Sequence, residues 1–332
     1  MTRQERVKKA IHFESPDRIP HYLPDGKEND ILWLWVPKPP PIRKWTNVGD
    51  NDEMTDCWGT KYQRVAGGRI GRGEVLEPVL PDITKHSEYK IPELIKPEFL
   101  EDIKKQIAEN AASENPKYVL CVMPYSSLNE GTHNLMGIEN MFLAYYEHPE
   151  ELKEFISRLS ELQEESIRVL ADLGCDGVMG YDDWGLQDSL MVGIPQIEEF
   201  FMPHYRKNWG LAHELGMDVW LHSCGQIIDV LPLFIDAGLT VIQQDQQENM
   251  VLEVLSEKFG GKLAFWSPVD IQKTMIEGSP EEVSAYAKRM IETLGSHNGG
   301  FVSMAYSTPE DVNHTPENMA AMCSSFRANE KY

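Results

Sequence analysis

A histidine and a cysteine stand two residues apart in the stretch VWLHSCGQII, residues 219 to 228, and together they could bind a metal ion. In a β-strand the side chains alternate between the two faces, so His222 and Cys224 would point the same way. Imidazole nitrogen and thiolate sulfur are both good zinc ligands. A structural role is the alternative, because cysteine packs well as a small buried group and a lone histidine is often a hydrogen-bonded core residue.

The composition is that of a globular protein that repels polyanions. The 332 residues include 31 Lys and Arg against 53 Asp and Glu, a formal net charge of −22. This charge disfavours nucleic acid and anionic membrane surfaces as partners. No signal peptide and no apolar run of about eighteen residues occurs, so no membrane span is expected. The five scattered cysteines are typical of reduced thiols, and we expect a cytoplasmic protein.

Short apolar runs alternate with longer helical patterns from about residue 97 onward, which predicts parallel β/α units. With RIPHYL, residues 18 to 23, and one weaker N-terminal run, the strands could reach the eight that close a (β/α)8 TIM barrel. We predict a single barrel domain over 1–332, with an N-terminal helical and hairpin extension plus the first barrel elements in 1–96 and the main repeats in 97–332. The expected helices cover 2–12, 97–111, 138–173 with a break at Pro149, 195–216, 226–237, 250–259, 279–295 and a last one from Pro316.

Two N-terminal segments are expected outside these repeats. ILWLWVPKPPPIRKW, residues 31 to 45, is predicted to be a loop carrying an aromatic cluster, because its triple proline cannot continue a helix or a central strand. Such a loop would be either an apolar flap packed on the body or a lid that contacts substrate. DCWGTKYQRVAGG, residues 56 to 68, is predicted to form a strand and the turn of a hairpin.

The ends of the predicted strands are rich in polar groups: PYSS, YDDWG, HSCG, QQDQ, FWSPVD and AYS. In parallel α/β barrels the chemistry lies at the carboxyl ends of the strands. A strand end that only caps a helix would show one Ser, Asp or Asn, whereas here several polar residues converge on one rim. This convergence favours the metal site over the structural role for His222 and Cys224.

Several common catalytic motifs are missing. No G-x-G-x-x-G follows the first strand, and neither G-x-x-x-x-G-K-[ST] nor G-x-S-x-G occurs, which disfavours dinucleotide binding, phosphate binding in a P-loop and serine hydrolase chemistry. GGRIGRG, residues 67 to 73, lacks the strand-then-helix context and predicts a turn. Parallel side chains at His222 and Cys224 suit shared coordination of one ion better than proton transfer to a cysteine nucleophile.

Several segments occur in the order found in the uroporphyrinogen decarboxylase superfamily. They are RQERVKKAIHFESPDRIP, DCWGTKY, GYDDWGLQDSLMVGIPQIEEFFMPHYRK, HELGMDVWLHSCGQIIDVLPLFIDAGLTVIQ, FWSPVDIQ and TPENM. The chain resembles this superfamily nearly end to end, and within it the cobalamin-dependent methyltransferase branch that includes methylcobalamin:coenzyme M methyltransferases. The resemblance implies a single (β/α)8 barrel, in agreement with the strand pattern.

The superfamily contains two chemistries. The decarboxylases use no metal and bind an octacarboxylate tetrapyrrole with N-terminal arginines and a buried aspartate. This chain lacks their R-x-x-G-R signature, and its segment PYSSLNEG, residues 124 to 131, has no aspartate. Together with the net charge of −22, these departures disfavour tetrapyrrole decarboxylation. A lyase acting on a carboxylated molecule and a non-catalytic ligand-binding relative stay open as alternatives.

The resemblance implies a zinc ion held by H-x-C and a distant cysteine after the last strand. His222 and Cys224 match the first two ligands, whereas Tyr306 and Ser307 occupy the region of the third, and Cys323 lies too far along the final helix. A third ligand must then come from another strand end. The candidates are, in order, Asp183, Asp182 and Gln244.

The implied function is methyl transfer between a small methyl ether, methylamine or thiol and cobalamin. No cobalamin-binding D-x-H-x-x-G motif occurs, so the cobalamin would come from a separate corrinoid protein. An oxygen ligand in place of a thiolate would make the zinc a better Lewis acid and favour demethylation. Asp182 and Asp183 could equally cap a helix, and aromatic residues near strand ends are often core. The residues expected to act in catalysis are Asp182, Asp183 and Gln244, with Asp245 as a further orienting group, and those expected to line an apolar substrate pocket are Trp184, Trp266, Phe301, Met304 and Tyr306.

Overall fold

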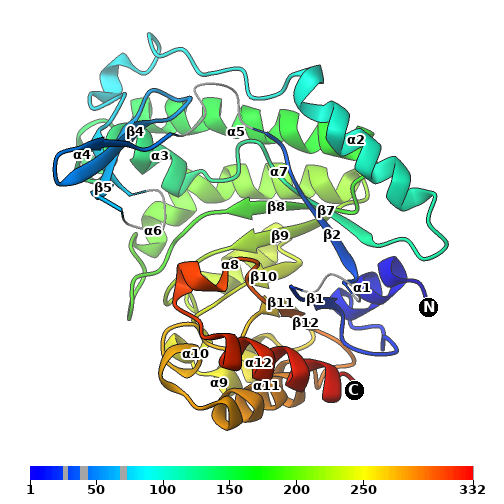
Figure 1. The fold of residues 1–332 in the computed structure, drawn as a ribbon. Coiled ribbons are helices and arrows are strands. Elements are labelled where there is room, and N and C mark those ends of the chain that lie inside the picture. Colours follow the sequence, from blue (N-terminus) through cyan, green and yellow to red (C-terminus); the bar gives the residue numbers. More distant parts are fainter. Residues whose placement is uncertain (25–28, 38–43, 68–72, 332) are drawn as a thin grey trace.

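The computed structural model describes residues 1–24, 29–37, 44–67 and 73–331, and its core is a single (β/α)8 barrel of eight parallel strands (Figure 1). The hydrogen-bonded order is β1-β12-β11-β10-β9-β8-β7-β2. The Asp30 amide N–H donates to the His21 carbonyl at 2.9 Å and brings the two outermost strands together. The barrel strands are β1 (His21–Tyr22), β2 (Ile31–Trp35), β7 (Tyr118–Val122), β8 (Gly177–Tyr181), β9 (Asp218–His222), β10 (Val241–Gln243), β11 (Ala264–Ser267) and β12 (Phe301–Met304).

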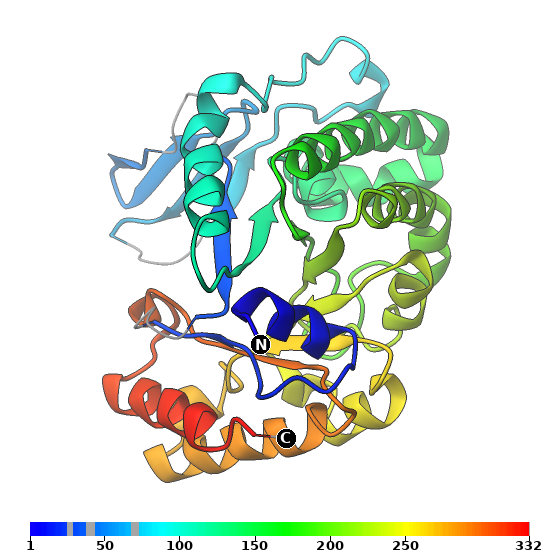
Figure 2. The ribbon, with the colours of Figure 1, turned by 90° about the vertical axis from the view of Figure 1, so that its right-hand side faces the viewer.

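Helices surround the strands, and α1 lies across the amino-terminal end of the barrel (Figure 2). The sequence-based prediction of an α/β barrel is therefore confirmed. No helix within the described ranges combines the length and the apolar character needed to cross a bilayer. The helices are α1 (Arg3–Ile11), α2 (Pro97–Ala111), α3 (Asn129–Met136), α4 (Ile138–Glu147), α5 (Pro149–Asp172), α6 (Ile194–Gln196), α7 (Met202–Glu214), α8 (Leu231–Ala237), α9 (Leu252–Phe259), α10 (Thr274–Glu277), α11 (Pro280–Leu294) and α12 (Pro316–Ala328), with 3-10 turns at Ile83–Lys85, Gln247–Asn249 and Pro309–Val312.

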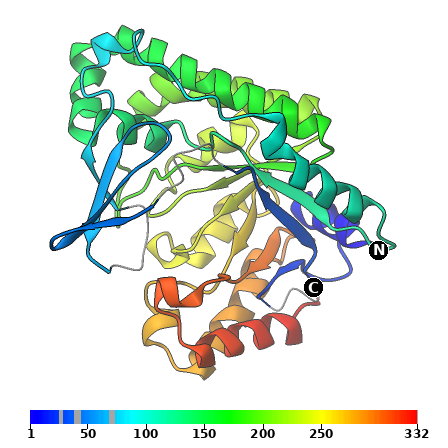
Figure 3. The ribbon, with the colours of Figure 1, turned by 45° about the horizontal axis from the view of Figure 1, so that its top comes forward.

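A second, antiparallel sheet stands beside the barrel next to α3 and α4 (Figures 1 and 3). It contains the predicted hairpin, and its strands are β3 (Thr46–Val48), β4 (Asn51–Thr55), β5 (Lys61–Val65) and β6 (Glu74–Glu77). The Leu80 amide N–H donates to the Leu135 carbonyl at 2.8 Å, which ties the segment after β6 to α3.

Three local predictions are corrected by the structure. Residues 31–35 form the barrel strand β2 and not a loop, because the alternating run ILWLW ends before the prolines. The triple proline and residues 68–72 of the predicted turn GGRIGRG lie outside the described residues. The helix expected over 226–237 begins only at Leu231, with proline in its first turn. The helix expected over 195–216 contains a π-helical turn at Ile197–Phe201, next to Pro203, which has no N–H to donate to the preceding turn.

Apolar side chains form two cores, one on each side of the barrel wall. The larger core lies between the strands and the helices, and a smaller one fills the barrel interior. Because side chains alternate along each strand, every second residue points inward. The interior set includes Tyr118, Met179, Trp220, Trp266 and Met304, and Val7 and Ile11 of α1 close it from below.

A polar network crosses the amino-terminal end of the barrel and depends on pH. His12 Nε2 lies 2.8 Å from Asp218 Oδ1, and Tyr118 O–H donates to Asp218 Oδ2 at 2.8 Å. The hydrogen bond to Asp218 raises the pKa of His12. Burial and the charge of Lys8 lower this pKa, and the charge of Glu14 raises it. A raised histidine pKa stabilises the fold below the unfolded value, about 6.5, and this contribution disappears as the pH rises through the folded value.

We therefore expect His12→Asn to lower the free energy of unfolding by about 0.5 kcal/mol at pH 5.5 and by less at pH 8.5. The effect is small because nearly half of the His12 side chain is exposed to solvent. Urea unfolding of the wild type and the variant at both pH values measures it. Equal losses at the two pH values would contradict the assigned ion pair.

Candidate metal centre at the barrel mouth

Three potential metal ligands meet at the carboxyl ends of β8 and β9. Asp183, His222 and Cys224 each offer one ligand atom, and these atoms all lie within 4.8 Å of one another. His222 Nε2 is 3.3 Å from Cys224 Sγ and 3.5 Å from Asp183 Oδ1. The structure thus brings together the two residues singled out by spacing and the first of the three candidate third ligands. We call these residues the triad.

The local backbone explains how the triad forms. His222 is the last residue of β9, and its carbonyl accepts the Asp182 N–H at 2.9 Å, which aligns the two strand ends. Beyond them, a Cβ atom on Gly225 would lie 2.5 Å from the backbone of Gly185, and Gly225 has a φ of +79°. Only glycine permits this close approach of the two loops with that conformation. The contact holds Cys224 beside Asp183, whose Oδ1 accepts the Cys224 N–H at 2.8 Å.

The two distances from His222 Nε2 to the other ligand atoms of the triad are those expected around a tetrahedral zinc ion. Zinc bonds of about 2.0–2.1 Å to nitrogen or oxygen and about 2.3 Å to sulfur place neighbouring tetrahedral ligands roughly 3.3–3.6 Å apart. The distances from His222 Nε2 to the other two ligand atoms, 3.3 and 3.5 Å, match this range. Three protein ligands leave one position open, as in catalytic zinc sites.

The electrostatics of the triad also favour a cation. Burial alone would lower the pKa of His222, but the negative charges of Cys224, Asp183 and Asp245 outweigh burial and raise that pKa well above its ordinary value. Burial raises the pKa of Cys224, against the influence of His222. The cluster thus draws a positive charge to itself, and a metal ion would supply that charge while displacing protons from the ligands.

Three further polar residues extend from the triad across the mouth. His222 Nδ1 is hydrogen-bonded to Gln243 Oε1, Gln243 Nε2 donates to Asp245 Oδ1, and Tyr306 O–H donates to Asp245 Oδ2. Burial raises the pKa of Asp245, while His222, Tyr306 and Gln243 act in the opposite direction. Metal-binding histidines usually have such a partner on the second ring nitrogen.

A cavity of about 220 Å³ opens over this row of residues. Aromatic rings of Trp33, Tyr181 and Tyr306 form much of its wall, and the Tyr181 ring lies 5.1 Å from the His222 ring. In the described part of the chain no lysine or arginine lines it. The lining residues are Trp33, Tyr181, His222, Gln243, Met304, Ala305, Tyr306 and Ser307.

A larger groove of about 650 Å³ reaches the triad from the other side and includes Asp183 in its wall. It lies between β6 and the helices α3 and α4. Glu74, Glu130 and Glu139 contribute to the same wall, so the approach to Asp183 is acidic. Because His222 lines the cavity and Asp183 lines the groove, the triad borders both spaces.

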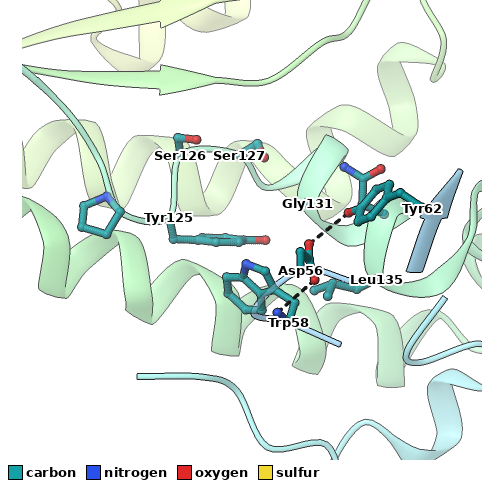
Figure 4. A pocket seen from close by; sticks show the side chains of 10 residues that line it. Asp56, Trp58, Tyr62, Tyr125, Ser126, Ser127, Gly131 and Leu135 are labelled. Carbon is teal, nitrogen blue, oxygen red and sulfur yellow. Dashed lines mark hydrogen bonds between the residues drawn. The ribbon is translucent and has the colours of Figure 1, made fainter. Parts of the chain in front are cut away.

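A third cavity, shown in Figure 4, has a structural character. It measures only about 40 Å³, enough for a few water molecules but not for a substrate. Asp56 accepts hydrogen bonds from Tyr62 O–H at 3.2 Å and the Trp58 N–H at 2.9 Å, and the Trp58 ring lies 5.1 Å from that of Tyr125 (Figure 4). The cavity therefore marks the joint between the small sheet and the loop after β7.

Asp182 and Gln244 lie outside the triad. The Asp182 carboxylate accepts the N–H groups of Leu128, Asn129 and Glu130 at 2.7 to 3.0 Å, and it also accepts Tyr205 O–H. Gln244 donates to the Gly225 carbonyl at 3.2 Å and accepts backbone N–H groups from the two residues that follow it. Both side chains thus form hydrogen bonds to the backbone of the loops that follow the strands and stabilise those loops.

The predicted pocket residues divide between the two sides of the barrel wall. Met304 and Tyr306 line the cavity, and Trp266 lies in the barrel interior with its ring 5.1 Å from that of Trp33. Trp184 is fully buried in the outer core, where it packs against Phe201 and Phe234. Phe301 also belongs to the outer core.

Sequence reasoning missed Gln243, Trp33 and Tyr181 as residues of the mouth. Strict alternation along β10 could have identified Gln243, because the Val241 side chain points inward and the side chain two residues later must do the same. In the parallel register Gln243 is paired with His222 across β9 and β10. Trp33 was missed because its segment was predicted to be a loop.

The chain is similar to one protein family and to several solved structures. A family model described as uroporphyrinogen decarboxylase (URO-D) matches residues 68–328. The solved structure of a methyltransferase from Methanosarcina mazei is 12% identical, with a TM-score of 0.65 over 99% of this chain and 99% of that chain. The structure of a D-psicose 3-epimerase is 10% identical, with a TM-score of 0.41 over 74% of this chain and 85% of the other.

At these identities the likeness to the solved structures concerns the fold alone. No curated protein sequence matches the chain. The family match covers well over half of the 332 residues and includes β7 to β12 with the triad. The superfamily resemblance inferred from the order of the sequence segments is thereby confirmed, and the chain belongs to the uroporphyrinogen decarboxylase family.

Proposed function

We propose that this protein is a zinc-dependent methyltransferase of a corrinoid system. The observation that carries the proposal is the triad, in which Asp183, His222 and Cys224 have the spacing of three zinc ligands at the mouth of a barrel. The methyltransferase whose fold spans the whole chain supports the same reaction class. The methyl group would pass between a small substrate and cobalamin carried by a separate corrinoid protein.

Zinc, when bound, supplies Lewis-acid chemistry toward an oxygen, nitrogen or sulfur atom of the substrate. His222, Cys224 and Asp183 would hold the ion. Trp33 and Tyr181 would place the substrate and keep water away from the cavity, because their rings form its apolar wall. The groove beside Asp183 would give the second reactant access to the same ion.

The oxygen ligand favours demethylation over thiol methylation. A carboxylate at Asp183 donates less electron density than a thiolate would, so the ion is a stronger Lewis acid toward an ether oxygen or an amine nitrogen. The heteroatom would keep the electron pair of its bond to the methyl carbon, and a Co(I) corrinoid on the partner protein would supply the electron pair of the new bond to the methyl group. We therefore propose a methyl ether or methylamine as the substrate.

Tetrapyrrole decarboxylation fits the cavity less well. A substrate with eight carboxylates needs cationic partners, and none lines the cavity among the residues that the structure describes. The acidic wall of the neighbouring groove, with Glu74, Glu130 and Glu139, would repel such a substrate further.

Purified protein is expected to contain close to one zinc per chain and to transfer methyl groups only when cobalamin or a corrinoid protein is added. Elemental analysis and an assay of methylcobalamin absorbance measure the two properties. A metal-free wild type with full activity would contradict the zinc site. Conversion of uroporphyrinogen to coproporphyrinogen without a corrinoid would instead establish a decarboxylase.

A further inference from the structure

The hydrogen bonds that join Tyr306, Asp245, Gln243 and His222 form a row with a defined direction. Asp245 and Gln243 are 1% and 3% exposed, so water does not replace their partners. Tyr306 donates to one Asp245 oxygen, and Gln243 donates to the other. His222 Nδ1 completes the row at the amide oxygen of Gln243.

The Asp245 carboxylate determines which group donates and which accepts in each hydrogen bond of the row. An ionised carboxylate only accepts hydrogen bonds, so the amide nitrogen of Gln243 must face Asp245. The amide oxygen then faces His222, and because this oxygen also only accepts, His222 must carry its proton on Nδ1. The lone pair of the neutral ring is left on Nε2, the atom that lies 3.3 Å from Cys224 Sγ and 3.5 Å from Asp183 Oδ1.

We propose that Tyr306, Asp245 and Gln243 are positioning residues that hold His222 in the Nδ1–H tautomer and so prepare its Nε2 for the metal. The proposal rests on the zinc site of the proposed function. It assigns a role to three residues outside the triad: Gln243 on β10, Asp245 in the loop after β10, and Tyr306 beyond β12. Outer partners of this kind typically change metal affinity by about 10-fold to 100-fold.

Exchanging the Asp245 carboxylate and the Gln243 amide tests which groups donate along the row, because an acid and its amide have nearly the same size and shape. In Asp245→Asn the new amide can face Gln243 with either its oxygen or its nitrogen, so the tautomer of His222 is no longer fixed. In the double variant Gln243→Glu/Asp245→Asn a carboxylate faces His222 directly and again accepts from Nδ1–H, while the amide at position 245 donates to it and accepts from Tyr306.

We expect Asp245→Asn to bind zinc about 10-fold or more weakly than the wild type, in competition with a chromogenic chelator. The double variant should return to within about 3-fold of the wild type, which loss of packing alone would not produce. Tyr306→Phe should weaken zinc binding by roughly 3-fold to 10-fold. Nitrogen-15 spectra of the zinc-free protein, recorded at a pH high enough for the His222 ring to be neutral, should show Nδ1–H at His222 in the wild type and the double variant, and mixed tautomers in Asp245→Asn.

Two matched substitutions serve as controls for zinc affinity. Tyr22→Phe removes the hydroxyl of a tyrosine packed against the barrel interior, outside the row and outside the cavity, and Asp270→Asn replaces another buried carboxylate, which accepts backbone N–H groups after β11. Both should bind zinc as the wild type does.

Wild-type zinc affinity and an unchanged tautomer in Asp245→Asn would overturn the proposal, as would a double variant no better than the single one. A wild type that binds no zinc would refute the proposed metal site. The spectra would then decide the positioning role by themselves, and an Nε2–H tautomer in the wild type would refute it.

Discussion

Replacement of Cys224 by alanine is expected to abolish zinc binding and to lower the rate of methyl transfer by roughly 10³-fold or more. The thiolate contributes one of three ligand atoms, and a group that binds the ion directly should matter more than outer partners, whose loss typically costs about 10-fold to 100-fold. Zinc content after dialysis and the initial rate with added corrinoid measure the effect.

The same variant should stay folded. The Cys224 side chain is not fully buried, and its backbone N–H keeps the hydrogen bond to Asp183. Cys323→Ala is the matched control, because it removes a thiol from α12, in the outer core and outside the triad. Loss of zinc from the Cys323 variant, with zinc retained in the Cys224 variant, would reverse the assignment of the ligands.

Asp182→Ala is expected to lower the free energy of unfolding by about 3–5 kcal/mol. The substitution would leave three backbone N–H groups at the start of α3 and the buried Tyr205 hydroxyl without their acceptor, and each unsatisfied group costs about 1–3 kcal/mol before relaxation. Burial raises the pKa of Asp182 to about 7, against the pull of these donors. Urea unfolding followed by circular dichroism measures the loss.

The neighbouring residue provides the contrast. Asp183→Ala should change the free energy of unfolding by no more than about 1 kcal/mol, because more than a third of the Asp183 side chain is exposed, but it should release the zinc. Retention of zinc by Asp183→Ala would remove the carboxylate from the ligand set. A stable Asp182→Ala protein that has lost zinc would indicate instead that Asp182, and not Asp183, binds the ion.

The fold was predictable because strands and helices alternate along most of the chain. Ranges such as Pro97–Ala111 and the break at Pro149 follow from local rules about proline and apolar spacing. The strand β2 was not predictable in the same way, since its hydrogen-bonded partner is β7, which follows the small sheet and α2 in the sequence. Its alternating residues were outweighed by the prolines that follow.

The triad was predictable from close spacing in the sequence and from the order of the strands, although β9 ends at His222 and Cys224 lies just beyond it. His222 and Cys224 lie two residues apart, so their proximity needs no knowledge of the barrel. Asp183 required the order of neighbouring strands, which sequential β/α units also provide. Gln243 could have been chosen over Gln244 from the alternation along β10, whereas the outward direction of Trp184 depends on where β8 ends to within one residue, and the sequence does not define strand ends that closely.

The position of the triad between a cavity on one side and a groove on the other has a kinetic consequence. A reaction centre with a single entrance imposes a fixed order in which its two reactants bind. In the proposed transfer, a substrate seated against His222 would leave the approach past Asp183 open, so the two reactants could be bound together and in either order. The expected rate law is sequential, and initial-rate lines measured at several concentrations of the second reactant should intersect instead of running parallel.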